Sequence, residues 1–215
     1  MTRRSELDNA SALKQRRKYK IVRDSAAVIF LRDGYAGASV DDITREARVS
    51  KATLYSYFPE KSLMFQAAMQ AELHDAFQKS PFDKLSDGNV AEVLPRALTA
   101  LADWAVAQQR IRLLRTVTAE GVRFPHIAAA YHAALVGRII APLKALLDTW
   151  IDRGQIDRHD SEHSARQLVA MIMGQVQQHA MMNGSKLTRE QLVTCARAAA
   201  DLFLRGHAGT DQQTV

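Results

Sequence analysis

A cluster of hydroxyl, ammonium and phenol groups lies between residues 50 and 61, where the chain reads SKATLYSYFPEK. A short helical pattern begins at Ser50, so Ser50, Lys51 and Thr53 are expected in the first turn at a helix N-terminus. The free backbone N–H groups and the dipole of such a terminus favour a phosphate, and Lys51 adds a positive charge there. Tyrosine hydroxyls on the same segment are suitable phosphate donors. This chemistry indicates contact with a nucleic acid.

Two short helices joined by a tight turn are expected to position these groups. They span residues 40–58, which is the spacing of a helix-turn-helix. Ser39 is expected to cap the first helix, and the second is expected to begin at Ser50. Pro59 ends the second helix because the residue before a proline avoids the α region. A helix that enters the major groove N-terminus first presents its first residues to base edges. The alternative is a helical hairpin whose aromatic residues only fill a core.

Positive charge is concentrated in the N-terminal third of the chain. The formal net charge is +6, and residues 1–65 hold 13 Lys and Arg against 8 Asp and Glu, whereas residues 66–215 hold 16 against 15. A basic segment on a near-neutral body favours a polyanion-binding module joined to something else. The basic arm at residues 1–19 is expected to be either a disordered tail or an additional minor-groove or backbone contact, and both readings stay open.

Helical periodicity extends over nearly the whole chain, so we predict an all-α fold. An N-terminal three-helix domain with the helix-turn-helix is expected at residues 20–66, and a larger helical domain at residues 67–206. The last two helices are expected from Ser161 to Met182 and from a capping box at Thr188 to about Gly206. The tail at residues 207–215 is expected to be disordered.

The composition excludes several classes of protein. An apolar fraction of 47% and a charged fraction of 24% are those of an ordinary globular protein rather than a disordered chain. The single cysteine, Cys195, cannot form an internal disulfide or a multi-cysteine metal site. No apolar run approaches the ~18 residues of a membrane span, and the polar N-terminus is no secretory signal, so a cytoplasmic protein is expected. His159 and His163 are interpreted as a solvated helix start, and neither metal nor cofactor is expected.

The residues from 20 to 66 resemble a known family. VDDITREARVSKATLYSYFPEKSLMF resembles the signature of TetR-family transcriptional regulators, and the preceding AAVIFLRDGYAGAS is similar to that family's first helix and Gly-Tyr turn. The resemblance implies base or near-base contacts from Lys51, Thr53 and Tyr55. It implies phosphate contacts from Ser39, Tyr57 and Lys61. The full set of DNA-contacting residues that it implies is Ser39, Ser50, Lys51, Thr53, Tyr55, Tyr57 and Lys61.

Three positions depart from the family's usual pattern. Arg48 stands where glycine is common in the turn, so the turn must either avoid a positive φ or hold Arg48 there at a cost in stability. Ala52 replaces a frequent glycine, which is a mild change inside a helix. Glu60 stands where a small polar residue is usual, and its charge would repel phosphate.

The rest of the chain is similar to the AcrR and AefR-like branch of that family, a similarity carried by RIRLLRTVTAEGVRFPHIAAAYHAALVGRIIAPLKALLDTWIDRGQI. It implies a ligand-binding and dimerisation domain, with the last two helices of each subunit forming a four-helix interface. The local chemistry agrees, because the last helix is apolar around more than one face. A two-fold dimer places two recognition helices on two half-sites, so a palindromic double-stranded operator is expected.

Polar or aromatic residues on otherwise apolar helices are candidates for binding a small effector, which we expect to be apolar or amphipathic. Core packing or a surface position is the alternative for each of them. The apolar neighbours of Cys195 predict an inert buried thiol. The candidate ligand-binding residues are Trp104, Arg115, Glu120, Phe124, Tyr131, Met171, Gln175 and His179.

These observations together predict a ligand-responsive DNA-binding regulator and not an enzyme. We expect a repressor that a small hydrophobic effector releases from a palindromic operator. An architectural DNA-binding protein without an effector is one alternative. A helical-bundle enzyme is another, although the sequence has no paired Glu-x-x-His sets, glycine-rich phosphate loop or nucleophile elbow.

Overall fold

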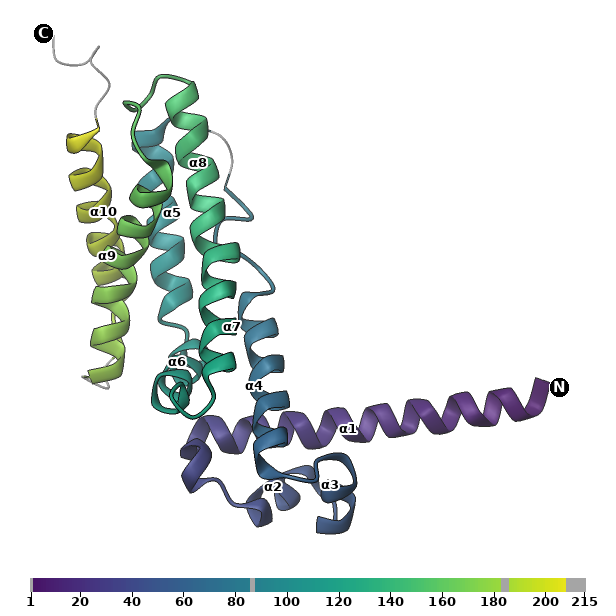
Figure 1. The fold of residues 1–215 in the computed structure, drawn as a ribbon. Coiled ribbons are helices and arrows are strands. Elements are labelled where there is room, and N and C mark those ends of the chain that lie inside the picture. Colours follow the sequence, from purple (N-terminus) through teal and green to yellow (C-terminus); the bar gives the residue numbers. More distant parts are fainter. Residues whose placement is uncertain (1, 86–87, 183–185, 208–215) are drawn as a thin grey trace, which may run out of the picture. The chain divides into compact units, whose positions relative to one another are not determined.

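The computed structural model describes residues 2–85, 88–182 and 186–207, and this part of the chain contains helices and no strands (Figure 1). The predicted all-α fold is confirmed. The chain divides into two compact units, one of residues 1–75 and 112–130 and the other of residues 76–111 and 131–215. The functional boundaries expected at residues 19, 66 and 206 stay predictions, and residues 208–215 of the expected tail lie outside the described residues.

The first unit contains the helix-turn-helix. Helix α1 (Thr2–Gly37) packs on α2 (Val40–Ala47), and α2 packs on α3 (Lys51–Tyr57). Helix α4 (Lys61–Phe77) follows and belongs to this unit through Asp75. The unit also holds most of α6 (Gln108–Glu120) and the first half of α7 (Pro125–Leu135). Its fully buried side chains include Phe30, Ile43, Leu54, Met64, Phe65 and Met69.

Helix α1 begins well before the position expected for the first helix. Residues 2–19, for which a disordered tail was one expectation, are helical. The physical reason is composition, because this stretch is rich in good helix formers and has no glycine or proline before Gly34. Gly34 has φ +72°, outside the helical region, so it interrupts the regular helix.

The predicted cap at Ser39 is confirmed, and Ser50, expected as the first residue of its helix, is instead the N-cap of α3. Ser39 Oγ accepts a hydrogen bond from the backbone N–H of Asp41 at 3.1 Å, and Ser50 Oγ accepts one from that of Thr53 at 3.1 Å. Between these helices Arg48 adopts the left-handed conformation, with φ 53° and ψ 46°. The turn therefore requires the positive φ that glycine adopts freely, and Arg48 holds it at a cost of about 1–2 kcal/mol.

The second unit is a bundle around α5 (Val90–Ala105), which packs on α9 (Ser161–Met182) and α10 (Arg189–Gly206), as Figure 1 shows. Helix α8 (Ala141–Asp152) packs on α9. The capping box predicted for α10 is confirmed, because Thr188 and Gln191 exchange hydrogen bonds at 2.8 and 3.2 Å. The side chains that fill this core include Leu94, Leu98, Leu101, Leu143, Leu147, Trp150, Ile172 and Ala196.

Two arginines cap the end of α4 within this unit. Arg110 Nη2 donates to the carbonyl of Ala76 at 3.3 Å, and Arg138 Nε donates to the carbonyl of Phe77 at 3.0 Å. Arg138 Nη2 also donates to the carbonyl of Gln78. The last carbonyls of a helix have no partner within it, and cations near them interact favourably with the helix dipole. Arg110 and Arg138 therefore fix the last turn of α4.

The helical path continues through Gly137 and Pro142 without a break. Residues Val136–Ile140 form a π-helix, η1, and the backbone N–H of Ala141 donates to the carbonyl of Val136, five residues earlier. Proline has no N–H and its ring crowds the carbonyl four residues before it, which the wider turn accommodates. The helix therefore widens locally before Pro142 and does not end there.

Candidate nucleic-acid interface

Helix α3 has one buried face and one open face. Leu54 is fully buried and Phe58, at the helix C-cap, is 4% exposed, so these two side chains anchor the helix. Ser50, Lys51 and Tyr55 are exposed on the other side, and the Tyr55 side chain is 45% exposed. The start of the helix therefore faces solvent with its hydroxyl, ammonium and phenol groups. Thr53 is half-buried, and its hydroxyl lies 3.0 Å from that of Ser50.

Lys51 is held by a carboxylate of the preceding helix. Its Nζ lies 2.6 Å from Asp41 Oδ1, and both side chains are more than half exposed. The hydrogen bond and the charge of Asp41 raise the pKa of Lys51 above its ordinary value of 10.5. Exposed ion pairs contribute about 0–1 kcal/mol, so a phosphate can replace Asp41 as the partner of Lys51 at little cost. The pair orients Lys51 without removing it from solvent.

The aromatic end of α3 contacts α1 through a residue that was not singled out in the sequence. The Tyr19 ring lies 5.0 Å from that of Phe58 and 6.2 Å from that of Tyr57. The sequence signal was that Tyr19 lies three residues before Val22, on the apolar face of α1. Tyr19 thus fixes the basic part of α1 against the recognition helix. Its exposed basic neighbours are Lys14, Arg16, Arg17, Lys18 and Lys20.

Lys61 lies at the first position of α4. Its ammonium group is 4.9 Å from the centre of the Tyr35 ring, and the guanidinium carbon of Arg123 lies 5.0 Å from the same centre. Cations over an aromatic face are attracted to it, so Tyr35 holds both charges. Ser39, the remaining predicted phosphate contact, is half-buried and caps α2. Glu60 is exposed, and its carboxylate accepts a hydrogen bond from Ser62 at 2.9 Å.

Three of the candidate ligand residues belong to the first unit. Phe124 is buried, with its ring 4.6 Å from that of Phe65. Glu120 Oε1 accepts a hydrogen bond from the backbone N–H of Tyr35 at 3.3 Å, and Arg115 is exposed. Glu120 and Phe124 therefore support the turn after Gly34, a role that the sequence pattern did not reveal.

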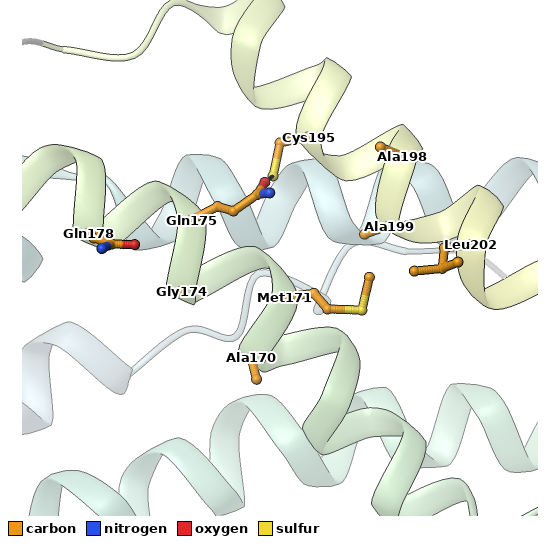
Figure 2. Close-up of a pocket in the computed structure, with 9 residues that line it drawn as sticks. All are labelled: Ala170, Met171, Gly174, Gln175, Gln178, Cys195, Ala198, Ala199 and Leu202. Carbon is orange, nitrogen blue, oxygen red and sulfur yellow. Dashed lines mark hydrogen bonds between the residues drawn. The ribbon is translucent and has the colours of Figure 1, made fainter.

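The other five candidates belong to the second unit, where they form separate groups. Trp104 is buried and Tyr131 half-buried, and both rings pack on Phe77, at 5.2 and 5.5 Å. His179 is half-buried on α9. Met171 and Gln175 lie elsewhere on α9, beside α10 (Figure 2). Within the second unit the structure thus brings Trp104 and Tyr131 together and places Met171 and Gln175 in a separate group.

Cys195 differs from its expectation as a buried thiol. It is half-buried and donates a hydrogen bond from Sγ to Gln175 Oε1 at 2.7 Å (Figure 2). Burial still raises the pKa of the thiol, which disfavours the reactive thiolate. The sequence neighbours of Cys195 are apolar, but its helical position turns it toward the polar amide of another helix.

His159 and His163 have different surroundings despite their helical spacing. The His159 ring lies 4.2 Å from that of His207, whereas His163 Nε2 contacts Gln167 Nε2 at 3.0 Å. Among the described residues, no group of three or more His, Cys, Asp or Glu residues is arranged to hold a metal ion. No helix in the described ranges is both long enough and apolar enough to cross a membrane.

Two family descriptions match the chain. Residues 22–68 match "Bacterial regulatory proteins, tetR family", and residues 92–208 match "AefR-like transcriptional repressor, C-terminal domain". The second match covers more than half of the chain. Together the two matches include the helix-turn-helix and most of the second unit.

Related proteins agree with these matches. The chain is 25% identical to the repressor KstR of Mycolicibacterium smegmatis over 93% of this chain and 91% of that protein. It is 33% identical to the repressor SCO4008 of Streptomyces coelicolor over 60 residues, which are 28% of this chain and 31% of that protein.

Solved structures show the same fold. A TetR-family regulator from Mesorhizobium loti MAFF303099 has a TM-score of 0.78 at 22% identity, over 90% of this chain and 98% of that one. The flavonoid-responsive regulator FrrA has a TM-score of 0.69 at 28% identity, over 89% of this chain and 97% of that one. With a helix-turn-helix whose recognition helix is open to solvent and a matching C-terminal domain, the chain belongs to the TetR family of DNA-binding transcriptional regulators, whose members are not enzymes.

Proposed function

We propose that this chain is an effector-responsive repressor that binds a palindromic operator as a homodimer. The observation that carries the proposal is the open N-terminal turn of α3, where Lys51 and Tyr55 are exposed while Leu54 anchors the helix. Lys51, Thr53 and Tyr55 contact base edges or their immediate surroundings. Ser39, Tyr57 and Lys61 contact phosphates, and Ser50 presents a capped helix N-terminus to the backbone.

Binding of the full-length protein to DNA from upstream of its own gene tests this assignment, with fluorescence anisotropy as the readout. Lys51→Ala should weaken binding by about tenfold or more and reduce discrimination between operator and scrambled DNA. Lys61→Ala should weaken binding to all sequences alike and lower the salt slope by about one unit. Lys84→Ala is the matched control, because Lys84 is an exposed lysine of the second unit. Absence of any bound palindrome would contradict the proposal.

The proposed dimer uses the outward face of α9 and α10. Small residues on these helices, such as Ala170, Gly174 and Ala198, allow another helix to approach closely (Figure 2). Leu202 lies on the same face, with 59% of its surface exposed. Ala198→Arg should therefore convert the dimer to a monomer in light scattering and weaken operator binding. A wild-type monomer at micromolar concentration would contradict the dimer.

The proposed effector is a small apolar or amphipathic molecule that binds the second unit. FrrA, which is 28% identical to this chain, is a flavonoid-responsive regulator, and this likeness supports a response to a small molecule. An effector lowers operator affinity only by its differential affinity for the two states of the protein. A panel of such compounds should contain one that raises the thermal midpoint and releases operator DNA. If none does so, the architectural alternative gains support.

A further inference from the structure

Among the described residues of the second unit, the side-chain N–H groups of Trp104 and Arg110 include buried donors without an acceptor. The Trp104 residue is 8% exposed, and its indole Nε1–H is buried with no partner among the described residues. Arg110 Nε–H, also in the second unit, is buried and has no partner among the described residues. An unsatisfied buried donor costs about 1–3 kcal/mol, so native proteins rarely leave one. Two such donors on stacked neighbours indicate a place where an acceptor binds.

The guanidinium of Arg110 lies over the ring of Trp104. The guanidinium carbon of Arg110 lies 4.5 Å from the centre of the Trp104 ring. Arg110 Nη1 donates to the carbonyl of Trp104 at 3.4 Å, and Nη2 donates to that of Ala76 at 3.3 Å. These two bonds cap the ends of α5 and α4 and leave Nε for another acceptor. Arg110 thus combines a structural role with an unused donor.

The charge of Arg110 points to the nature of that acceptor. Burial lowers the pKa of Arg110, and no carboxylate among the described residues forms an ion pair with it. A guanidinium nevertheless stays protonated near neutral pH. Helix ends supply only partial negative charge. A ligand with a full negative charge complements the cluster better than a neutral one.

Aromatic groups surround the donors. The Phe77 ring packs on Trp104, and Tyr131 packs on Phe77. The Tyr131 hydroxyl is hydrogen-bonded to the buried Gln177, and burial raises the pKa of this phenol, so it stays neutral. Aromatic rings beside a few polar groups are typical of sites for amphipathic ligands.

We propose that Arg110 and Trp104 form the recognition point for the carboxylate of an otherwise apolar effector. One carboxylate has two oxygens, which accept from Arg110 Nε–H and Trp104 Nε1–H while its charge pairs with the guanidinium. The apolar part of the molecule lies against the aromatic rings. This inference rests on the proposed response to an effector and names the chemical class of that effector.

Matched pairs of probes test the inference on the full-length protein. The pairs are trans-cinnamate with methyl cinnamate, and octanoate with octanol, which separate an aromatic from an aliphatic acid. Binding is followed by Trp104 fluorescence in a Trp150→Phe background, because the chain has two tryptophans. At least one acid should bind about tenfold or more tightly than its neutral partner. Arg110→Met should remove the preference for the acid. Trp104→Phe should reduce this preference, and its binding is followed by thermal shift because the variant lacks the Trp104 fluorescence.

Arg138→Met is the matched control. Arg138 also caps the end of α4, but its side chain has no buried donor without a partner in the described structure. This variant should keep the preference for the acid. The inference is overturned if neither acid binds, which leaves a buried water as the acceptor, or if acid and neutral partner bind alike. Equal loss of the preference in Arg110→Met and Arg138→Met would also overturn it. Operator binding without probe reports on the proposed function separately.

Discussion

Lys51 on α3 and Arg110 on α6 hold their positive charges in opposite ways. Lys51 is exposed and paired with a carboxylate 2.6 Å away. Arg110 is partly buried, donates to two helix-end carbonyls and lies over the Trp104 ring. The Lys51 pair is easily exchanged for a phosphate, whereas the contacts of Arg110 cannot change without disturbing two helix ends. An exchangeable cation suits binding to DNA, and a fixed cation suits a preorganised site for a small anion.

The largest expected effect is the difference in free energy of unfolding between the variants of these two cations. Arg110→Ala removes the side-chain donor to the Ala76 carbonyl, one of the donors to the Trp104 carbonyl and the contact with the Trp104 ring, so it should lower the free energy of unfolding by about 2 kcal/mol. Lys51→Ala should change it much less, because the pair is exposed. Urea unfolding of both variants measures this difference. Equal losses would show that the two cations do not differ in this way.

A smaller effect on stability is expected in the turn between α2 and α3, where Arg48 is the C-cap of α2. Arg48→Gly should raise the free energy of unfolding by about 1 kcal/mol, since glycine adopts φ 53° without the clash of a Cβ. Arg48→Ala is the control, because it removes the same charge and keeps the strain. If Gly and Ala variants have equal stability in urea unfolding, the strain at this position is negligible.

The sequence predicted the elements whose signals are local. Ser39 and Thr188 were expected to cap helices because each lies within three residues of the N–H group that it accepts from. The position of α3 followed from Pro59 and the apolar spacing. The fold class and the open face of the recognition helix therefore needed no long-range information.

The parts that were missed depend on contacts distant in sequence. Arg110 reaches Ala76, 34 residues earlier, and Tyr19 reaches Phe58 on another helix. In the sequence pattern, Glu120 and Phe124 resemble ligand-contacting residues. In the structure both contact Tyr35, which lies 85 residues before Glu120. The rotation of each helix about its axis decides such contacts, and periodicity alone gives it too coarsely.

The next prediction concerns the partner of Lys51. Asp41→Asn should raise operator affinity by a few-fold, because it releases Lys51 and removes a negative charge beside the bound phosphates. The gain should shrink with added salt, since both groups are exposed. Asp83→Asn, at an exposed residue of the second unit, is the charge-matched control. Weaker binding by Asp41→Asn would instead show that the ion pair must stay intact on DNA.

The smallest expected effect is the pH dependence of the Lys51 pair. The pKa of Lys51 is raised above 10.5 in the folded protein by its hydrogen bond to Asp41. A group with a raised folded-state pKa contributes stability that is complete below its unfolded value and is lost as the pH rises through the folded value. The difference in thermal midpoint between wild type and Lys51→Met should therefore be constant from pH 8 to about 10 and shrink above that. The charge of Tyr55 makes a smaller contribution to the same shift. A difference that grows above pH 10 would mean that Lys51 is stabilised by something other than Asp41, whereas Arg110, a guanidinium, should show no such alkaline loss over the same range.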